Sequence, residues 1–182
     1  MKIATIGRGN VGGGLADLWE KAGHDVTRIG KEGGDVSEAD AVLVAVPGGA
    51  IEAALENVRG LEGKTVIDAT NLFGADRPSG FRSNAEFVKS RTNGPTAKSF
   101  NVNGARLYGE LANARSKPGN LWTGDEEARD VVEQLNRDAG YEPLHGGPLE
   151  NARAQEDFLA IWVGISNQIG PFFYRMAPPA EL

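Results

Sequence analysis

Apolar residues recur along the chain with two different periods, which predicts strands separated by helices. The run AVLVAV at 41–46 is continuously apolar, as in a strand that is covered on both faces of its sheet. Leu15, Leu18, Trp19 and Ala22 instead recur at helical spacing. The predicted strands are residues 3–6, 25–29, 41–46, 64–69, 96–100, 120–123 and 141–144. The predicted helices are residues 12–22, 50–58, 84–90, 126–139 and 151 onward. This alternation predicts a doubly wound, parallel α/β sheet.

The C-terminal part of the chain differs from the rest in composition. We expect residues 1–145 to form the α/β domain and residues 146–182 to form an apolar helical appendage. This segment is more apolar than a one-sided surface helix needs to be, so it is either part of the core or the seam of a homodimer. Its large apolar residues are Phe158, Ile161, Trp162, Ile165, Ile169, Phe172 and Phe173.

Two connections depart from the regular pattern. The segment EGGDVSEAD, between Lys31 and Ala41, is shorter than the helical crossover that two parallel strands normally need. We therefore expect the rim of the sheet to be open beside the second strand. The loop at 103–119 is long, which is typical of functional or mobile loops.

The overall composition excludes several classes of protein. The net charge is -6 and no block of basic residues is present, which argues against nucleic-acid binding. The absence of cysteine excludes disulfides and thiolate catalysis, and we expect no metal site. The sequence shows neither a secretory leader nor an apolar run long enough to span a membrane, so we expect a cytoplasmic protein.

Glycines dominate the stretch IGRGNVGGGL, which follows the first strand and opens the first helix. Gly7, Gly9 and Gly12 have the spacing of the dinucleotide-binding fingerprint. In that motif the first glycine permits a tight turn, the second leaves room for a diphosphate, and the third lets helix and sheet pack closely. The amides at the helix start then face the phosphates. The pattern predicts a Rossmann-type fold that binds a dinucleotide.

The end of the second strand distinguishes NAD from NADP. An NAD site usually has an acidic residue there for the ribose hydroxyl, whereas this chain has Gly30 and Lys31. Lys31 can neutralise a 2′-phosphate, and Arg8 or Arg28 can add charge. Glu32 takes the acidic role if the register is shifted by one or two residues. We favour NADP(H).

The chain resembles the NADPH-dependent coenzyme F420 reductase family almost from end to end. The residues that carry the resemblance are MKIATIGRGNVGGGLADLWEKAGHDV, AVLVAVPGGAI, TVIDATNLFG, AKSFNVNGA and GNLWTGDEEARDVVEQLNRDAGYEPLHGGPLENAR. The cofactor domain of this family also occurs in STEAP-type metalloreductases and at the front of pyrroline-5-carboxylate reductases. The resemblance implies hydride transfer between NADP(H) and coenzyme F420, a flavin or a quinone-like electron acceptor.

The resemblance also implies roles for individual residues. The cofactor-binding residues it implies are Gly7, Arg8, Gly9, Asn10, Val11, Gly12, Lys31, Val46, Pro47, Ala69, Thr70 and Asn71. The implied walls of the acceptor pocket are Ser99, Phe100, Asn101, Gly147, Pro148 and Leu149. The family typically has Ser-Arg where this chain has Gly30 and Lys31. Lys31 would therefore contact the 2′-phosphate without a hydroxyl neighbour.

Hydride transfer between two planar rings requires orientation more than acid–base chemistry, so we assign no catalytic acid or base. We expect His24 to be structural, and we leave a substrate contact open for His145. Asp68 is expected to anchor the loop of Thr70 and Asn71. The alternative to an oxidoreductase is a module that binds or senses NADP(H) without turnover. In either case we expect a small-molecule ligand, no nucleic acid, no membrane span and a homodimer.

Overall fold

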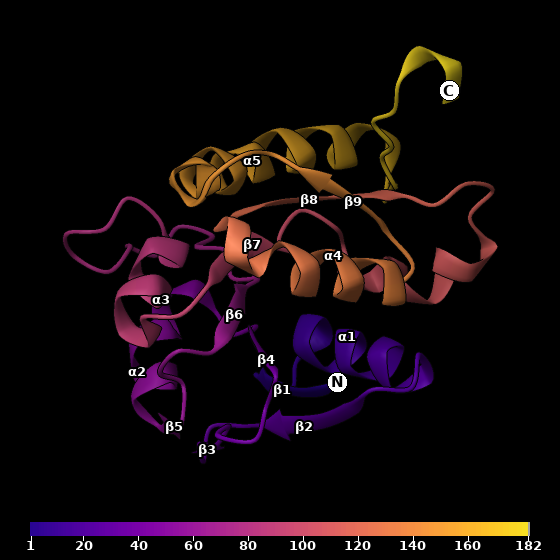
Figure 1. The fold of residues 1–182 in the computed structure, drawn as a ribbon. Helices are drawn as coiled ribbons and strands as arrows, with labels where there is room; N and C mark the ends of the chain where they lie inside the picture. The colour runs from indigo at the N-terminus through magenta and orange to yellow at the C-terminus, as the bar shows by residue number, and fades with distance from the viewer. Residues whose placement is uncertain (182) are drawn as a thin grey trace.

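A seven-stranded sheet forms the centre of the protein in the computed structural model, which describes residues 1–181 (Figure 1). Its strand order is β2-β1-β4-β6-β7-β8-β9. The strands are β1 (Lys2–Ile6), β2 (Asp25–Ile29), β4 (Ala41–Val44), β6 (Thr65–Asp68), β7 (Thr96–Ser99), β8 (Gly119–Gly124) and β9 (Glu142–His145). A separate two-stranded ladder joins β3 (Gly34–Asp35) to β5 (Val58–Arg59).

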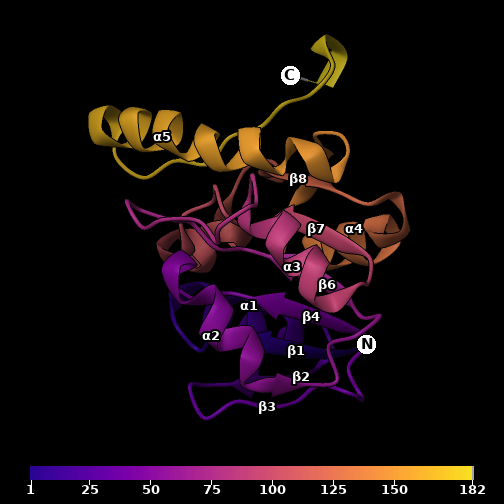
Figure 2. The ribbon, with the colours of Figure 1, turned by 90° about the vertical axis from the view of Figure 1, so that its left-hand side faces the viewer.

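Helices cover both faces of the sheet (Figure 2). The helices are α1 (Asn10–Lys21), α2 (Ile51–Glu56), α3 (Asn84–Thr92), α4 (Arg129–Asp138) and α5 (Ala152–Ile169). Short 3-10 segments are η1 (Gly48–Ala50), η2 (Ala105–Asn113), η3 (Glu126–Ala128), η4 (Leu149–Asn151) and η5 (Pro179–Glu181). Every predicted strand and helix is present, with its bounds shifted by at most about three residues, apart from the end of the C-terminal helix. That helix ends at Ile169, because Gly170 takes a φ of +83°, so Phe172 and Phe173 lie outside it.

Successive residues of the central strands enter opposite cores, as the continuous apolar run predicted. In β4, Ala41 and Leu43 pack with α1 and α4, whereas Val42 and Val44 pack with α2 and α3. All four residues are buried. The predicted doubly wound α/β class is therefore confirmed. No helix among residues 1–181 is long and apolar enough to cross a membrane.

Two strands differ from the wholly parallel sheet that we expected: β8 runs antiparallel to β7, and β9 runs parallel to β8. The chain between β7 and β8 does not return through a crossover helix but forms η2, which packs against α1. The ring of Tyr108 lies on the backbone of α1, where a Cβ on Gly14 would be 2.5 Å from Tyr108 Cδ2. This glycine, which lies outside the dinucleotide fingerprint, therefore makes room for the loop at 103–119.

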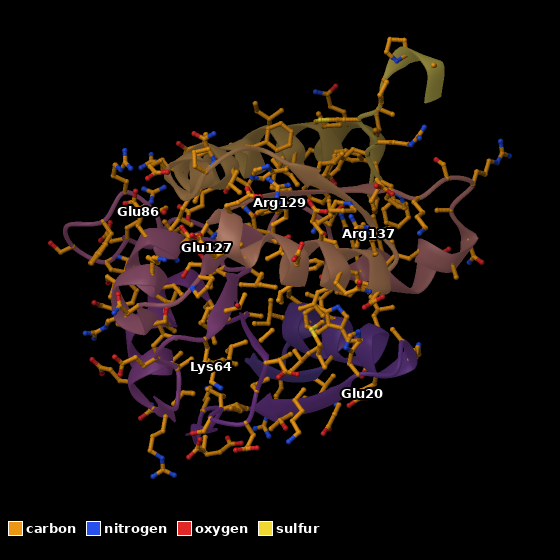
Figure 3. All side chains as sticks on the ribbon, viewed as in Figure 1. Glu20, Lys64, Glu86, Glu127, Arg129 and Arg137 are labelled. Carbon is orange, nitrogen blue, oxygen red and sulfur yellow. The ribbon has the colours of Figure 1, made fainter. Side chains whose placement is uncertain are left out.

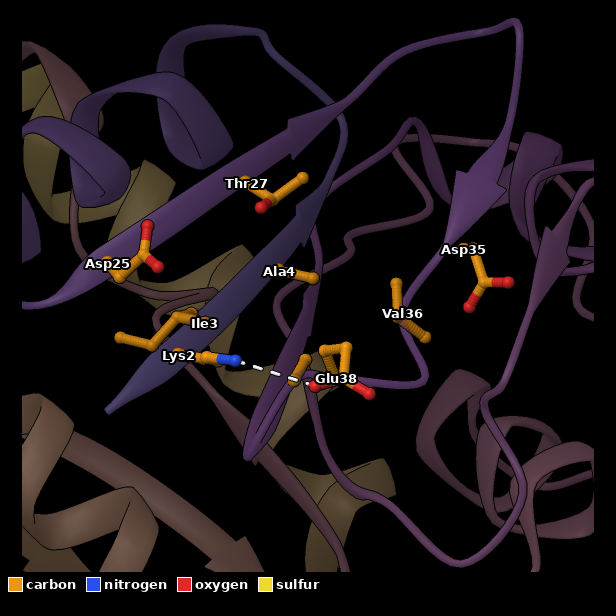
Figure 4. A pocket seen from close by; sticks show the side chains of 9 residues that line it. Lys2, Ile3, Ala4, Asp25, Thr27, Asp35, Val36 and Glu38 are labelled. Carbon is orange, nitrogen blue, oxygen red and sulfur yellow. Dashed lines mark hydrogen bonds and ion pairs between the residues drawn. The ribbon is translucent and has the colours of Figure 1, made fainter.

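The expected opening beside β2 is confirmed. The connection from β2 to β4 contains the two residues of β3 and no helix. A cavity of about 160 Å³ lies between β1, β2 and residues 35–39, and an ion pair of 3.5 Å between Lys2 and Glu38 borders it (Figure 4). Asp25 and Thr27, which a crossover helix would cover, are exposed on β2.

Candidate functional site

The turn from β1 into α1 requires glycine at two positions, one in the loop and one in the first turn of the helix. Gly7 has a φ of +108°, and its amide donates to the carbonyl of Ile29 at 2.9 Å. A Cβ on Gly7 would lie 2.2 Å from the carbonyl oxygen of Ala45, and one on Gly12 would lie 2.1 Å from the carbonyl oxygen of Gly7. Any side chain at these two positions would displace backbone, so both glycines serve the turn and the close packing of α1.

Gly9 differs from its neighbours because its Cβ would meet no atom within 4 Å. It is the N-cap of α1, and Asn10 and Val11 begin the first helical turn. No side chain among residues 1–181 caps this helix, and the first turn contains no acidic residue. The first amides of α1 therefore lack side-chain acceptors and lie beside open space. This arrangement fits the phosphates of a dinucleotide.

Cations and one carboxylate gather at the end of β2. Arg8 pairs with Glu32 through two contacts of 3.2 Å, and its guanidinium lies over Gly30, whose Cβ would be 2.1 Å from a guanidinium nitrogen. Lys31 is exposed, and within the described chain it forms neither an ion pair nor a side-chain hydrogen bond. Glu32 is thus engaged with Arg8, whereas the ammonium group of Lys31 is available to a phosphate.

Arg28 is directed away from this cluster. Its guanidinium pairs with two carboxylates of α1, those of Asp17 and Glu20. Figure 3 labels Glu20. The hydrogen bond from Arg28 lowers the pKa of Glu20 and raises that of the arginine. Arg28 therefore joins β2 to α1 and does not add charge beside Lys31.

The loops that follow β1, β4 and β6 adjoin one another. The carbonyl oxygen of Ala45 packs against Gly7 of the glycine loop. Val46 and Pro47 follow Ala45 in the chain and lead to Gly48. The Gly48 amide donates to the carbonyl of Asn71 at 3.2 Å. The structure therefore brings the predicted residues of three loops to one edge of the sheet, where parallel strands end and ligands commonly bind.

The loop after β6 is held by its own side chains. The Thr70 amide donates to Asp68 Oδ1 at 2.8 Å, which is the anchoring role expected for this carboxylate. Asn71 Nδ2 donates to the carbonyl of Asn101 at 2.7 Å, and Asn101 Nδ2 returns a bond of 3.2 Å to Asn71 Oδ1. Ala69 is buried in the core on the α1 side. Residues 69–71 are thus fixed relative to the end of β7.

Ser99 and Phe100 lie elsewhere than the expected acceptor wall. Phe100 has a φ of +60°, is buried, and packs edge-on against Trp19 and Tyr141 at 5.8 and 6.4 Å between ring centroids. Ser99 Oγ accepts a hydrogen bond of 3.0 Å from the buried Asn120 Nδ2. Both side chains belong to the interior.

Pro148 and Leu149 lie where the chain enters α5. Pro148 is exposed and precedes η4. Leu149 is buried in a small cluster with Ala85 of α3 and Ala152 of α5. Leu149 therefore packs α5 against α3 at the start of the C-terminal segment.

A groove of about 570 Å³ opens between the loop after β6 and α5. Its lining residues are Asn71, Leu72, Phe73, Gly74, Arg77, Glu156, Asp157, Leu159, Ala160 and Val163. Phe73 has a φ of +42° and a side chain that is 78% exposed, so its ring stands at the mouth of the groove. The groove begins at Asn71, beside the loops described above, and has one apolar wall on α5.

The sequence analysis missed one charged residue at this edge. Lys98 of β7 is fully buried, and its ammonium group donates to Asp68 at 2.8 Å, to the carbonyl of Thr70 at 2.7 Å and to Glu156 at 3.1 Å. A lysine within the strand TAKS, beside a strand that ends in aspartate, was a signal for this pairing.

Neither histidine lies at the groove. His24 Nε2 pairs with Asp138 at 2.8 Å and Nδ1 lies 3.2 Å from the N-terminal amine, which fits the expected structural role. His145 stacks on Trp122 at 4.1 Å between ring centroids and contacts Arg129. His145 is thus part of a surface cluster at the end of β9.

No protein-family model matches the sequence, and no curated protein matches it either. Solved structures do resemble it. A protein of Arthrobacter sp. FB24, described as a candidate F420-dependent NADP reductase, has a TM-score of 0.78 and 20% identity over 98% of this chain and 100% of its own. The reductive aminase of Aspergillus terreus, solved with NADPH and ethyl levulinate, has a TM-score of 0.66 and 17% identity over 92% of this chain and 62% of its own. The 3-hydroxyisobutyrate dehydrogenase of Mycobacterium tuberculosis, solved with L-serine, has a TM-score of 0.61 and 16% identity over 93% of this chain and 66% of its own. These similarities establish the Rossmann-type fold.

Proposed function

We propose that the protein is an NADP(H)-dependent oxidoreductase that transfers a hydride to or from a planar electron acceptor. The observation that carries this proposal is the opening at Gly9, where uncapped helix amides face open space between loops that fit a dinucleotide. The names of two similar structures, one of an NADP reductase and one of an NADPH complex, support the choice of cofactor.

Each loop has a distinct role in this proposal. The first amides of α1 hold the diphosphate, and Lys31 contacts the 2′-phosphate of the adenosine half. Val46 and Pro47 would lie under the ribose, and residues 69–71 would border the nicotinamide ring. Bound NADPH supplies the hydride at that ring, so the loops orient the ring and exclude water from it.

We assign the acceptor to the groove between residues 71–77 and α5. Its volume of about 570 Å³ lies within the usual range of small-molecule sites, about 300–1,000 Å³. Leu159, Ala160 and Val163 give it an apolar wall, and Phe73 provides an exposed ring at its mouth. These surfaces suit a planar ring system such as a deazaflavin (coenzyme F420), a flavin or a quinone. Asn101 acts indirectly at this site, because it is hydrogen-bonded to Asn71, which lines the groove. Ser99 and Phe100 support the groove from the interior of the protein.

Calorimetry with NADPH, followed by absorbance at the nicotinamide band in the presence of F420, FMN or a quinone, tests the proposal. We expect NADPH to bind and to be oxidised by at least one acceptor. Ala160→Trp should fill the groove and abolish oxidation without weakening NADPH binding, whereas Gln168→Trp, at an exposed position of α5, should change neither. Tight NADPH binding with no oxidation by any acceptor would favour the sensing module. No NADPH binding would refute both functions.

We further propose that the protein forms a homodimer through α5. Ile161, Ile165 and Ile169 are 58%, 40% and 69% exposed at a spacing of four residues, so one face of the helix is apolar and uncovered. The same face of a second copy would bury it. Sedimentation equilibrium should give twice the monomer mass, and Ile165→Lys should halve it. A monomeric wild-type protein would refute this proposal.

A further inference from the structure

Lys98 connects three elements through a single ammonium group. Its side chain is fully buried, and its three N–H donors are satisfied by Asp68 at the end of β6, by the carbonyl of Thr70 in the next loop, and by Glu156 of α5. A buried lysine is costly unless it is paired, so these contacts strongly constrain the three partners.

On the nucleotide side, the partners of Lys98 fix the loop at 69–71. Asp68 uses its second oxygen to accept from the Thr70 amide at 2.8 Å, and Thr70 Oγ1 accepts from Asn84 Nδ2 at 2.8 Å. The carboxylate that binds Lys98 therefore also shapes the loop that we place beside the nicotinamide. Loss of Lys98 would leave Asp68 buried without its counter-ion.

On the acceptor side, Lys98 holds the groove wall through Glu156. Glu156 Oε1 also accepts from the backbone amide of Asn84 at 2.9 Å, and Glu156 Oε2 accepts from Arg77 Nε at 3.3 Å. Glu156 and Arg77 both line the groove. The only buried residues of α5 are Ala152, Gln155 and Trp162, so the first turns of this helix have few apolar anchors within the described structure. The side chain of Gln155 accepts from Thr123 Oγ1 at 2.9 Å and donates to Asn101 Oδ1 at 2.8 Å, so Gln155 and Glu156 together hold the α5 wall in position.

The four charged groups form a chain from the interior to the groove. Asp68, Lys98, Glu156 and Arg77 alternate in sign and sum to zero, with contacts of 2.8, 3.1 and 3.3 Å between neighbours. A change at Lys98 therefore acts on the loop at 69–71 and on α5 together. Lys98 itself does not line the groove and cannot touch an acceptor there.

We infer that Lys98 is a positioning residue for hydride transfer, because it sets the α5 wall of the groove relative to the nicotinamide loop. This inference rests on the proposed function for the reaction it serves. The coupling of loop and helix through Lys98 has a readout of its own, because the exchange of backbone amides in both segments does not depend on turnover.

The test compares Lys98→Met with Lys89→Met. Lys89 of α3 also forms a 2.7 Å ion pair, with Asp125, but it lies outside the groove. We expect Lys98→Met to keep the dissociation constant for NADPH within about twofold and to slow single-turnover hydride transfer by about 10–100-fold, since small displacements of reacting rings cost that much. Hydrogen–deuterium exchange should rise in residues 69–71 and 152–160. Lys89→Met should change neither transfer nor this exchange.

The double variant Asp68→Asn/Lys98→Met separates positioning from stability. Removing the unpaired carboxylate should restore the melting temperature of Lys98→Met, but the transfer rate should stay low because Glu156 still lacks its partner. Recovery of the rate together with the melting temperature would overturn the inference, as would wild-type transfer in Lys98→Met.

If Lys98→Met does not fold, Glu156→Gln replaces it: transfer should slow and exchange should rise in residues 152–160 while residues 69–71 stay protected. Unchanged transfer and exchange in Glu156→Gln would overturn the inference. If the wild-type protein reduces no acceptor, the proposed function fails, and exchange alone decides whether Lys98 couples the loop to α5: unchanged exchange in Lys98→Met overturns that coupling.

Discussion

Replacing Gly9 by alanine tests diphosphate binding while changing the stability of the fold very little. The Cβ of an alanine at this position would meet no protein atom within 4 Å, and the φ of -77° is one that alanine adopts readily. The methyl group would instead occupy the open space where we place the diphosphate. Gly9→Ala should therefore weaken dinucleotide binding without unfolding the loop.

Gly9→Ala has two opposing effects on the stability of the fold, and they are of similar size. Alanine is a poorer N-cap than glycine by about 1 kcal/mol, and it recovers about 0.4–1 kcal/mol by restricting the unfolded chain. The net change is within about 1 kcal/mol, or about 2–4 °C in the melting temperature of a chain this long. Losing one charge-assisted hydrogen bond to the diphosphate costs about 1.5–3 kcal/mol, which is about a 10–100-fold loss of affinity.

The assay is calorimetric titration with NADPH, alongside thermal unfolding. Gly109→Ala is the matched control, because its Cβ would also meet no atom within 4 Å and it lies in η2. Gly12→Ala should lose both stability and binding, because its Cβ would overlap the carbonyl oxygen of Gly7 at 2.1 Å. If Gly9→Ala binds NADPH as tightly as Gly109→Ala does, the diphosphate does not lie on this loop and the reasoning is refuted.

Three other predictions concern the cofactor and the fold. Lys31→Ala should weaken NADPH binding by about 1–3 kcal/mol and leave NADH binding unchanged, and equal losses in titrations of both would contradict the NADP assignment. Gly14→Ala should destabilise the protein by about 1–3 kcal/mol in urea unfolding, because its methyl would overlap the Tyr108 ring, and an unchanged midpoint would argue against this packing. Burial raises the pKa of all three tyrosines, that of Tyr174 to about 12, so the folded protein resists their ionisation. Their contribution to stability should be present below pH 10 and decline as the pH rises from about 10 to 12, and a native absorbance titration with a phenolate midpoint near 10 would contradict it.

The sequence predicted the fold because each signal was local. The run at 41–46 showed a strand covered on both faces, and the short segment after Lys31 showed that a crossover helix was missing. The reversed direction of β8 and β9 was not predictable in this way. It depends on η2 packing against α1 through Tyr108, a contact between segments far apart in sequence.

The site was predicted less evenly. The glycine loop carries its geometry in residue spacing, so Gly7, Gly9 and Gly12 lie where the motif places them. Phe100 was predicted less well: its positive φ directs the ring into the core, and no neighbouring residue in the sequence predicts that backbone conformation. Lys98 was missed because its partners come from three elements, including Glu156 of α5, that only the folded chain assembles.

The missing crossover helix also leaves the edge strand β2 more exposed to other molecules of this protein. β2 is an edge strand, and the absent helix leaves one of its faces uncovered as well. An uncovered apolar edge would invite strands of other molecules to add to the sheet and would favour aggregation. Here the outward positions hold Asp25 and Thr27. A carboxylate and a hydroxyl thus keep the uncovered face of β2 polar, and the charge of Asp25 disfavours the pairing of this edge strand with strands of other molecules.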